Sequence, residues 1–298
     1  MIAPVVRTRA NTLGEKGRRW LAELPSLVEE LGRDWGFADP EPLAGGTAAL
    51  VARVRLRDGS PAVLKIAVPD EEAANEIAVL TAAGGRGYVR LLEADPARLA
   101  MLQPELGPSM VALGMPPEEA ITALCATLRE AWTLPTAVGR VQDTAALLAT
   151  LVEDLYGKLR EPCPRHVVEL ALEYARRRSA GAGAGAGAEV VVHGDPHPGN
   201  ALRRGDGFAF VDPVGIRCDP AYDLGVILRD WPERLLGGDA GALARDWCAR
   251  LSAGSDVDHD AIWEWGYLER VSTGLHLTDL GLGDEGAGYL ASAERLAR

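Results

Sequence analysis

The alternation of apolar and polar residues predicts a small antiparallel sheet in the first third of the chain. In residues 50–57, four apolar side chains alternate with one valine and three arginines, which is the period-two pattern of a strand with one buried face. Asp58-Gly59 is typical of a tight hairpin turn, and residues 62–67 return as the partner strand. Apolar runs over residues 88–93 and 99–103 predict two further strands.

Helical periodicity dominates the rest of the chain. Residues 16–35 place large apolar side chains at near-helical spacing, although we expect Pro25 to break or restart this helix. Apolar stripes with the spacing of a helix face recur in residues 121–132, 148–159 and 165–178. The predicted sheet region is thus followed by a mostly helical region.

Two stretches interrupt the regular patterns. Residues 103–108 combine Pro and Gly and predict a domain boundary. We therefore expect an N-terminal domain over residues 1–105 and a mostly helical domain over residues 106–298. Residues 179–188 contain repeated Ala-Gly pairs, a composition that predicts a flexible connector without chemistry of its own.

Composition narrows the choice of partners. The chain has 298 residues and a net charge of −12, which opposes binding to nucleic acid or to an anionic membrane and favours a cationic small molecule. Its four cysteines form no Cys-x-x-Cys pair, so we expect free thiols in a reducing compartment. No run has the length of a signal peptide core or of a membrane span, and we expect a cytoplasmic protein.

Candidate chemistry is concentrated in one polar loop. The valines of residues 190–192 lead into His-Gly-Asp-Pro-His-Pro-Gly-Asn, and a second apolar run over residues 208–211 ends at Asp212. One carboxylate can take a hydroxyl proton, while an amide oxygen and a second carboxylate hold Mg²⁺ against phosphates. The spacing His-x-Asp-x-x-x-x-Asn resembles the catalytic loop of kinases. This resemblance implies phosphoryl transfer, with Asp195 as the catalytic base and Asn200 and Asp212 as metal ligands.

Two other kinds of site use the same loop. A metal-dependent hydrolase could bind Zn²⁺ through two imidazoles and a carboxylate, from His193, His197 and Asp195. Such a site would not explain the presence of Asn200 and Asp212. A noncatalytic ATP-binding module would be expected to lose the catalytic or the metal-binding side chain, and both are present in this sequence.

A lysine in the predicted sheet supports the phosphoryl-transfer hypothesis. Lys65 lies in the apolar run of residues 62–67, and a charged side chain is seldom buried without a partner. Glu76 lies beside the apolar stripe of the following helix and is the expected partner, with Glu72 as the alternative. Such a lysine would hold the α- and β-phosphates of a nucleotide. A glycine-containing loop, Gly45-Gly46-Thr47, precedes the hairpin and resembles a kinase nucleotide loop.

Eight segments, in order along the chain, carry a family resemblance. They are Trp20, Leu24–Leu27, Gly45–Gly46, Ala62–Lys65, Asn75–Glu76, Gly87–Ala94, His193–Asn200 and Asp219–Leu224. Together they resemble the aminoglycoside phosphotransferase superfamily, in the branch that contains streptomycin 6-kinase and hydroxyurea phosphotransferase.

The resemblance implies an α+β, protein-kinase-like bilobal fold. The N-terminal lobe would hold an antiparallel β-sheet and one key helix, and the C-terminal lobe would be mostly helical. ATP would be the donor, together with two Mg²⁺ ions. His193 and Asp223 would support the catalytic loop, and Gln103 and Glu105 would lie at the hinge that receives adenine. Pro-Val follows Asp212 where protein kinases carry Phe-Gly, so no protein substrate is expected.

The acceptor is expected to bind among the C-terminal helices. An acidic, aromatic lining suits the amino or guanidino groups of a cyclitol. We expect an aminoglycoside, with the 6-hydroxyl of streptomycin first and antibiotic resistance as the role, and with hydroxyurea, an amino sugar or a nucleoside antibiotic as alternatives. The residues expected to bind the acceptor are Asp230, Trp231, Glu233, Trp263, Glu264 and Glu269.

Overall fold

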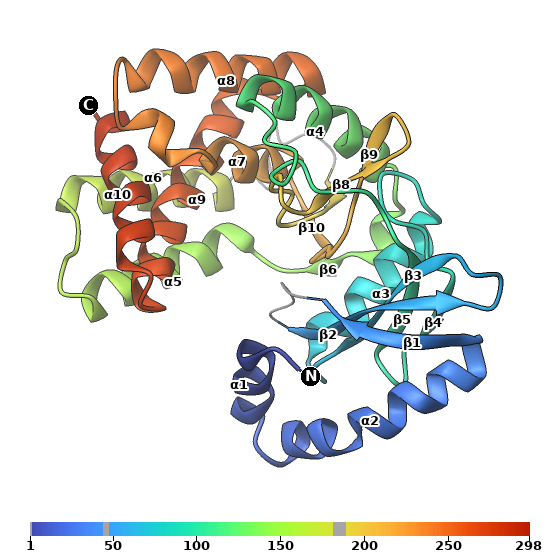
Figure 1. Cartoon of the computed structure of the whole chain (residues 1–298). Helices are drawn as coiled ribbons and strands as arrows, with labels where there is room; N and C mark the ends of the chain where they lie inside the picture. Colours follow the sequence, from blue (N-terminus) through green and yellow to red (C-terminus); the bar gives the residue numbers. More distant parts are fainter. Residues whose placement is uncertain (1, 44–47, 181–188) are drawn as a thin grey trace. The chain divides into compact units, whose positions relative to one another are not determined.

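The computed structural model describes residues 2–43, 48–180 and 189–298 (Figure 1). The chain separates into two compact units, residues 1–107 and 108–298. In the first unit, the strands form one five-stranded sheet in the order β1-β2-β3-β5-β4. Their bounds are β1 (Phe37–Pro42), β2 (Ala49–Leu56), β3 (Pro61–Ala67), β4 (Glu93–Asp95) and β5 (Ala100–Pro104). All the pairings are antiparallel.

The hairpin between β2 and β3 forms at the predicted turn. Gly59 has a φ of 85°, which a residue without a Cβ adopts at little cost. The Asp58 carboxylate accepts a hydrogen bond of 2.9 Å from the backbone N–H of Ser60, the local bond that favours Asp in turns. The register pairs Lys65 of β3 with Val51 of β2.

Helices α1 (Pro4–Thr12), α2 (Glu15–Trp35) and α3 (Glu71–Ala83) complete the first unit. Leu64 and Ile66 of β3 belong to the core that contains the apolar side of α2. Because side chains alternate along a strand, Lys65 points to the opposite side of the sheet, where α3 lies (Figure 1). Asp70 caps α3 by accepting a hydrogen bond from the N–H of Ala73.

Two expectations for the first unit were wrong. Helix α2 runs unbroken from Glu15 to Trp35 with Pro25 inside it. The buried side chains of Trp20, Leu24 and Leu31 lie on both sides of Pro25, so packing on the sheet compensates for the hydrogen bond that proline removes. The strand expected over residues 88–93 begins only at Glu93, because three glycines with positive φ between residues 84 and 87 keep the chain in turns.

The second unit is mostly helical. Its helices are α4 (Pro117–Ala131), α5 (Thr144–Lys158), α6 (Arg165–Ala180), α7 (Ala221–Arg229), α8 (Ala240–Ser255), α9 (His259–Asp279) and α10 (Gly283–Leu296), with short 3₁₀ turns at η1 (Thr136–Val138) and η3 (Pro232–Leu235). Most residues of α9 are buried, as expected for a helix at the centre of a helical unit. The predicted connector falls partly on α6, which includes Ser179, and its residues 181–188 lie outside the described residues.

Small strands in the second unit carry the polar loop. Strands β6 (Arg140–Val141), β7 (Val190–Val192) and β10 (Ile216–Cys218) form a sheet in the order β6-β10-β7, and β8 (Ala201–Arg204) pairs with β9 (Gly207–Phe210) as a hairpin. None of the helices in the described ranges combines the length and the apolar character needed to cross a membrane.

Helices α7 and α9 approach each other closely through two glycines. A Cβ added to Gly225 of α7 would lie 2.5 Å from the Cβ of Trp265 and 2.7 Å from the backbone nitrogen of Gly266. Carbon atoms in contact are about 3.5–4.0 Å apart. Only glycine at this position therefore allows the two backbones to lie so close.

Candidate active site

The loop from His193 to Asn200 connects β7 to β8, and His193 fixes its beginning. The His193 side chain is fully buried. Its Nδ1 accepts a hydrogen bond of 3.1 Å from the N–H of Asp195, so Nε2 carries the proton and donates to the carbonyl of Val211 at 2.9 Å. Burial lowers the pKa of His193 to about 4, which keeps the ring neutral. His193 is thus a structural residue of the loop.

Asp223, in the first turn of α7, holds the same part of the loop. Its carboxylate accepts hydrogen bonds of 2.8 Å from the N–H groups of His193 and Gly194. The indole N–H of Trp132 donates a third bond of 2.8 Å. Burial raises the pKa of Asp223 to about 6, although the three donors favour the charged form. The expected contact between Asp223 and the loop backbone is present.

Asn200, at the end of the loop, has an orientation that its hydrogen bonds determine. Its Nδ2 donates to the backbone carbonyl of Asp195 at 3.0 Å. Because a carbonyl only accepts, the amide nitrogen faces Asp195 and Oδ1 is left as an acceptor for a cation. The N–H of Val211 donates to the Asn200 carbonyl at 3.0 Å, which extends the β8–β9 ladder by one residue pair.

Asp212 follows directly after this extended ladder. Its exposed side chain has a backbone φ of 59°, an uncommon conformation for a residue other than Gly that recurs at functional sites. Asn200 and Asp212 therefore leave the same end of one hairpin. An amide oxygen and a carboxylate are ligands that Mg²⁺ accepts together with waters and phosphates.

Asp195 lies between two basic side chains. Its Oδ1 is 2.6 Å from Nη2 of Arg229, and its Oδ2 is 3.7 Å from Nε2 of His197. The Asp195 side chain is 40% exposed, enough for a substrate to reach it. Burial would raise the pKa of Asp195, but the Arg229 guanidinium, with the nearby histidines, holds it below its ordinary value. Asp195 is therefore a carboxylate at neutral pH, as a general base must be.

Arg229 is a site residue that the sequence reasoning missed. It ends α7, and its Nη1 lies 2.6 Å from Oε2 of Glu269 in α9. Although burial opposes its charge, the carboxylates of Glu269 and Asp195 raise the pKa of Arg229. The sequence offered one signal for this role, an arginine at the end of a mostly apolar helix. The structure buries all of residues 221–228, and a charged side chain in such a setting requires a partner.

The geometry argues against zinc at His193, Asp195 and His197. Both ring nitrogens of His193 are occupied by loop hydrogen bonds, and Nδ1 of His197 accepts a bond of 3.0 Å from the N–H of Gly199. Zinc requires a nitrogen lone pair from each histidine, and His193 offers none. In the described part of the chain, no group of three His, Cys, Asp or Glu side chains has the arrangement of a metal site.

In the first unit, the expected ion pair between Lys65 and Glu76 is present. Nζ of Lys65 lies 2.6 Å from Oε1 of Glu76, and both side chains are 11% exposed. Glu105 forms an ion pair with Arg53 of β2, so its carboxylate is already engaged. Gln103 lies in β5 opposite Val63. The predicted nucleotide loop, Gly45-Gly46-Thr47, lies outside the described residues.

The residues expected to bind the acceptor differ in availability. Burial raises the pKa of Asp230 to about 6, and its Oδ1 is 3.9 Å from Nε of Arg229. Glu233 is exposed on η3. Trp263 is half-buried on α9 beside Tyr174. Asp230 is thus the candidate that lies next to the Asp195 cluster.

For three other acceptor candidates, the structure argues against direct binding. Glu264 is buried between Arg177, at 3.0 Å, and Arg178, at 2.7 Å. Glu269 is 4% exposed and paired with Arg229. Trp231 packs its ring edge-on to Trp247 at 5.7 Å. Receiving a ligand at Glu264 or Glu269 would break a buried ion pair and leave a charge unpaired. At Trp231 it would disturb the packing of a half-buried indole on Trp247.

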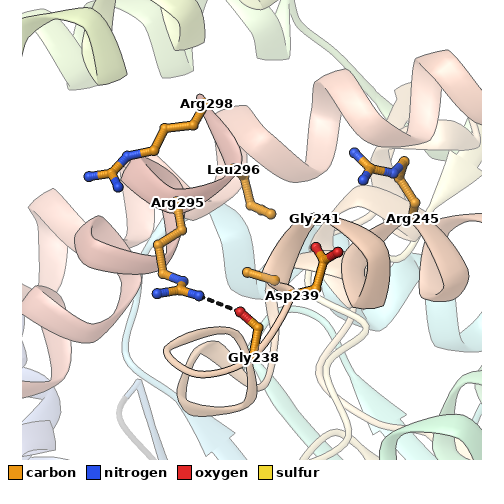
Figure 2. Close-up of a pocket in the computed structure, with 8 residues that line it drawn as sticks. Gly238, Asp239, Gly241, Arg245, Arg295, Leu296 and Arg298 are labelled. Carbon is orange, nitrogen blue, oxygen red and sulfur yellow. Dashed lines mark hydrogen bonds between the residues drawn. The ribbon is translucent and has the colours of Figure 1, made fainter.

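Another pocket of the second unit has a different location and lining. It has a volume of about 510 Å³ and is lined by residues of α8 and α10 with the turn before α8. None of the predicted site residues lines it. Figure 2 shows Nη2 of Arg295 donating to the carbonyl of Gly238, a bond of 2.7 Å, and shows Arg245 and Arg298 on opposite sides of Leu296. The guanidinium groups therefore do not converge on one point.

Comparison with known proteins assigns the chain to a family. The profile of the aminoglycoside/hydroxyurea antibiotic resistance kinases matches residues 34–281. The chain belongs to this kinase family. The matched range includes Lys65 and the segment from His193 to Asp212. The protein is accordingly a phosphotransferase.

Three curated relatives show the extent of the similarity. A streptomycin 6-kinase from Streptomyces glaucescens is 33% identical over 238 residues, 77% of this chain and 72% of the relative. A streptomycin 6-kinase from Streptomyces griseus is 30% identical over 294 residues, 96% of this chain and 93% of the relative. A hydroxyurea phosphotransferase from Kitasatospora aureofaciens is 31% identical over 236 residues, which cover 74% of this chain and 66% of the relative.

Solved structures show that this family member has the bilobal, kinase-like α+β fold. A thermostable mutant of aminoglycoside phosphotransferase APH(4)-Ia, in a ternary complex with ADP and hygromycin B, matches with a TM-score of 0.63 at 12% identity, over 91% of this chain and 97% of that one. Choline kinase LicA from Streptococcus pneumoniae matches with a TM-score of 0.58 at 14% identity, over 92% and 99%. The fold class predicted from the sequence is confirmed.

Proposed function

We propose that this kinase transfers the γ-phosphoryl group of ATP to the 6-hydroxyl of streptomycin. The observation that carries the proposal is a catalytic loop with Asp195, Asn200 and Asp212 in kinase order, in a chain 30% identical over 294 residues to a streptomycin 6-kinase. The net charge of −12 favours a cationic acceptor of this kind. The role is then antibiotic resistance.

Asp195 is the group that receives the proton of the attacking hydroxyl. Its carboxylate is charged and accessible, and its main chain is fixed by His193 and Asn200. As the hydroxyl oxygen bonds to the γ-phosphorus, the bond to the leaving ADP oxygen breaks and the proton passes to Asp195. In phosphoryl transfer, positioning and electrostatic stabilisation provide most of the rate.

ATP as the donor is supported by Lys65 and by the solved relatives. The buried pair of Lys65 and Glu76 presents a rigid ammonium group of the kind that binds α- and β-phosphates. APH(4)-Ia was crystallised with ADP. We assign the adenine to the main chain near Gln103 and Glu105, and the phosphates to the loop at Gly45–Thr47 and to Lys65.

Mg²⁺ would be held by Asn200 and Asp212. Their oxygens leave one end of the β8–β9 hairpin, and Oδ1 of Asn200 is directed away from the Asp195 carbonyl. When bound, the ion neutralises charge on the phosphates. Two protein ligands suit Mg²⁺, which usually keeps several waters and binds to the nucleotide as well.

The two parts of the chain would divide the work, with residues 1–105 binding the nucleotide and residues 106–298 carrying the catalytic loop and the acceptor. Asp230 and Glu233 would bind amino or guanidino groups, and Trp263 would provide an apolar wall. No protein substrate is expected, because only six residues separate Asp212 from Asp219 and leave no room for an activation loop. We place the activity in the cytoplasm, where ATP is available.

The test is a panel of acceptors at saturating ATP and Mg²⁺. ADP release is measured with streptomycin, hydroxyurea, kanamycin, an amino sugar and a nucleoside, and mass spectrometry identifies the phosphorylated product. The proposal predicts the highest kcat/KM with streptomycin. A preference for hydroxyurea, the acceptor named for a relative 31% identical, would replace the acceptor but keep the chemistry. ADP release from none of them would refute the proposed function.

A further inference from the structure

The Asp195 carboxylate pairs with the guanidinium of Arg229, which also pairs with a more deeply buried carboxylate. Arg229 bridges two carboxylates, with Nη2 at 2.6 Å from Oδ1 of Asp195 and Nη1 at 2.6 Å from Oε2 of Glu269. The exposed fraction falls inward along this chain of contacts, from 40% for Asp195 to 16% for Arg229 and 4% for Glu269. The outermost member is the proposed catalytic base.

The position of Arg229 is fixed by the close approach of α7 and α9. Gly225 and Gly266 let the two helices lie in backbone contact, and Arg229 follows Gly225 by one helical turn, as Glu269 follows Gly266 by three residues. A guanidinium is planar and its donors form a rigid fork. Removing either carboxylate would leave a largely buried charge with one partner fewer.

Every other part of Asp195 is already fixed. Its N–H donates to His193 and its carbonyl accepts from Asn200, which leaves the side-chain torsions as the remaining freedom. The contact with Arg229 occupies Oδ1. Oδ2, which lies 3.7 Å from His197, is then the oxygen available to a substrate.

We propose that Arg229, held by Glu269, is a positioning residue that directs Oδ2 of Asp195 toward the acceptor hydroxyl. This inference rests on the proposed function, in which the hydroxyl proton passes to Asp195 while the new oxygen–phosphorus bond forms. Arg229 touches neither reactant and acts only through Asp195. A displacement of about 1 Å at a reacting group can cost about 100-fold in rate.

The experiment is a double-mutant cycle with chemical rescue. Arg229→Ala, Asp195→Asn and the double variant are assayed for ADP release with the acceptor that the wild-type enzyme uses. We expect Arg229→Ala to lower kcat by about 100-fold with a change in KM below about 3-fold. In the Asp195→Asn background the same change should have an effect below about 3-fold, because a residue that acts through Asp195 has nothing left to position.

Rescue separates positioning from folding. Guanidinium at a concentration on the order of 10 mM should raise the kcat of Arg229→Ala at least about 10-fold over its value without guanidinium. Methylammonium should not raise it, because only the planar guanidinium fork can bridge two carboxylates. Arg177→Ala is the matched control, since Arg177 pairs with Glu264 of the same helix α9 and its loss should leave kcat within about 2-fold. Thermal unfolding of each variant reports on the fold.

The outcomes are distinguishable. Multiplicative losses in the double variant would show that Arg229 acts directly on a reactant, and unchanged kcat in Arg229→Ala would show that it does nothing for the reaction. Either result overturns the inference and leaves the proposed function intact. Absence of wild-type turnover with every acceptor refutes the proposed function and this inference with it.

Discussion

Replacing Gly225 with alanine should separate the two helices that carry the candidate site. The new Cβ would lie 2.5 Å from the Cβ of Trp265 and 2.7 Å from the nitrogen of Gly266, which is about 1 Å less than a normal contact. Two of the obstructing atoms are backbone atoms of Trp265 and Gly266, which a change of rotamer cannot move. Overpacking of this kind costs about 3 kcal/mol, and the gain in helix propensity returns about 1 kcal/mol.

The expected loss in unfolding free energy is therefore about 2 kcal/mol. For a unit the size of residues 108–298, this corresponds to a fall in Tm of about 4–8 °C. Because α7 carries Asp223 and Arg229, we also expect kcat to fall about 10-fold as Asp195 loses its supports. Differential scanning fluorimetry and ADP release measure the two effects.

Gly157→Ala is the matched control for this prediction. Gly157 lies exposed in α5, and nothing lies within 4 Å of an added Cβ. Alanine there should raise the unfolding free energy by about 0.5–1 kcal/mol and leave kcat unchanged, because only helix propensity changes. A Gly225→Ala variant with the Tm and kcat of the wild type would refute the reasoning that places α7 against α9.

Three further predictions follow from burial and charge. The folded-state pKa of Asp230, about 6, exceeds the ordinary 3.8, so wild-type stability should fall as pH rises from about 4 to 6. Over this pH range, the unfolding free energy of Asp230→Asn, measured in urea, should rise by up to about 3 kcal/mol relative to that of the wild type. A difference between the two proteins that does not change with pH would contradict the raised pKa of Asp230. Glu76→Gln should raise the KM for ATP about 10-fold by loosening Lys65, and an unchanged KM would exclude a role for the pair. Alkylation of the native protein at pH 8 should be slow, because burial raises the pKa of all four thiols to about 11 or 12. It should begin at Cys163, which is only half-buried, and rapid labelling of a buried thiol would contradict this order. The buried thiols are those of Cys125, Cys218 and Cys248.

The catalytic loop could be predicted because its information is local. Within eight residues, His193 to Asn200, the sequence carries the proposed catalytic aspartate, an amide and the residues that turn the chain. The structure shows local hydrogen bonds of the kind that such a motif requires, from the Asp195 N–H to His193 and from Asn200 to the Asp195 carbonyl. The hairpin at Asp58-Gly59 was predictable for the same reason.

Contacts between distant segments could not be predicted in the same way. Arg229 meets Asp195 and Glu269 from 34 and 40 residues away, through a helix approach that only the packing of Gly225 reveals. Glu264 was predicted as an acceptor ligand, and the sequence gives no sign of its hydrogen bond with Arg177, 87 residues earlier. Local propensity likewise placed a break at Pro25, where packing on the sheet preserves the helix.

The central claim is that Asp195 receives the proton of an acceptor hydroxyl during phosphoryl transfer. Its most direct test is ADP release at saturating ATP, Mg²⁺ and streptomycin by the wild-type enzyme and by Asp195→Asn, with the product identified by mass spectrometry. We predict that wild type forms streptomycin phosphate and that Asp195→Asn has a kcat lower by at least about 100-fold. A variant that turns over near the wild-type rate would contradict the account.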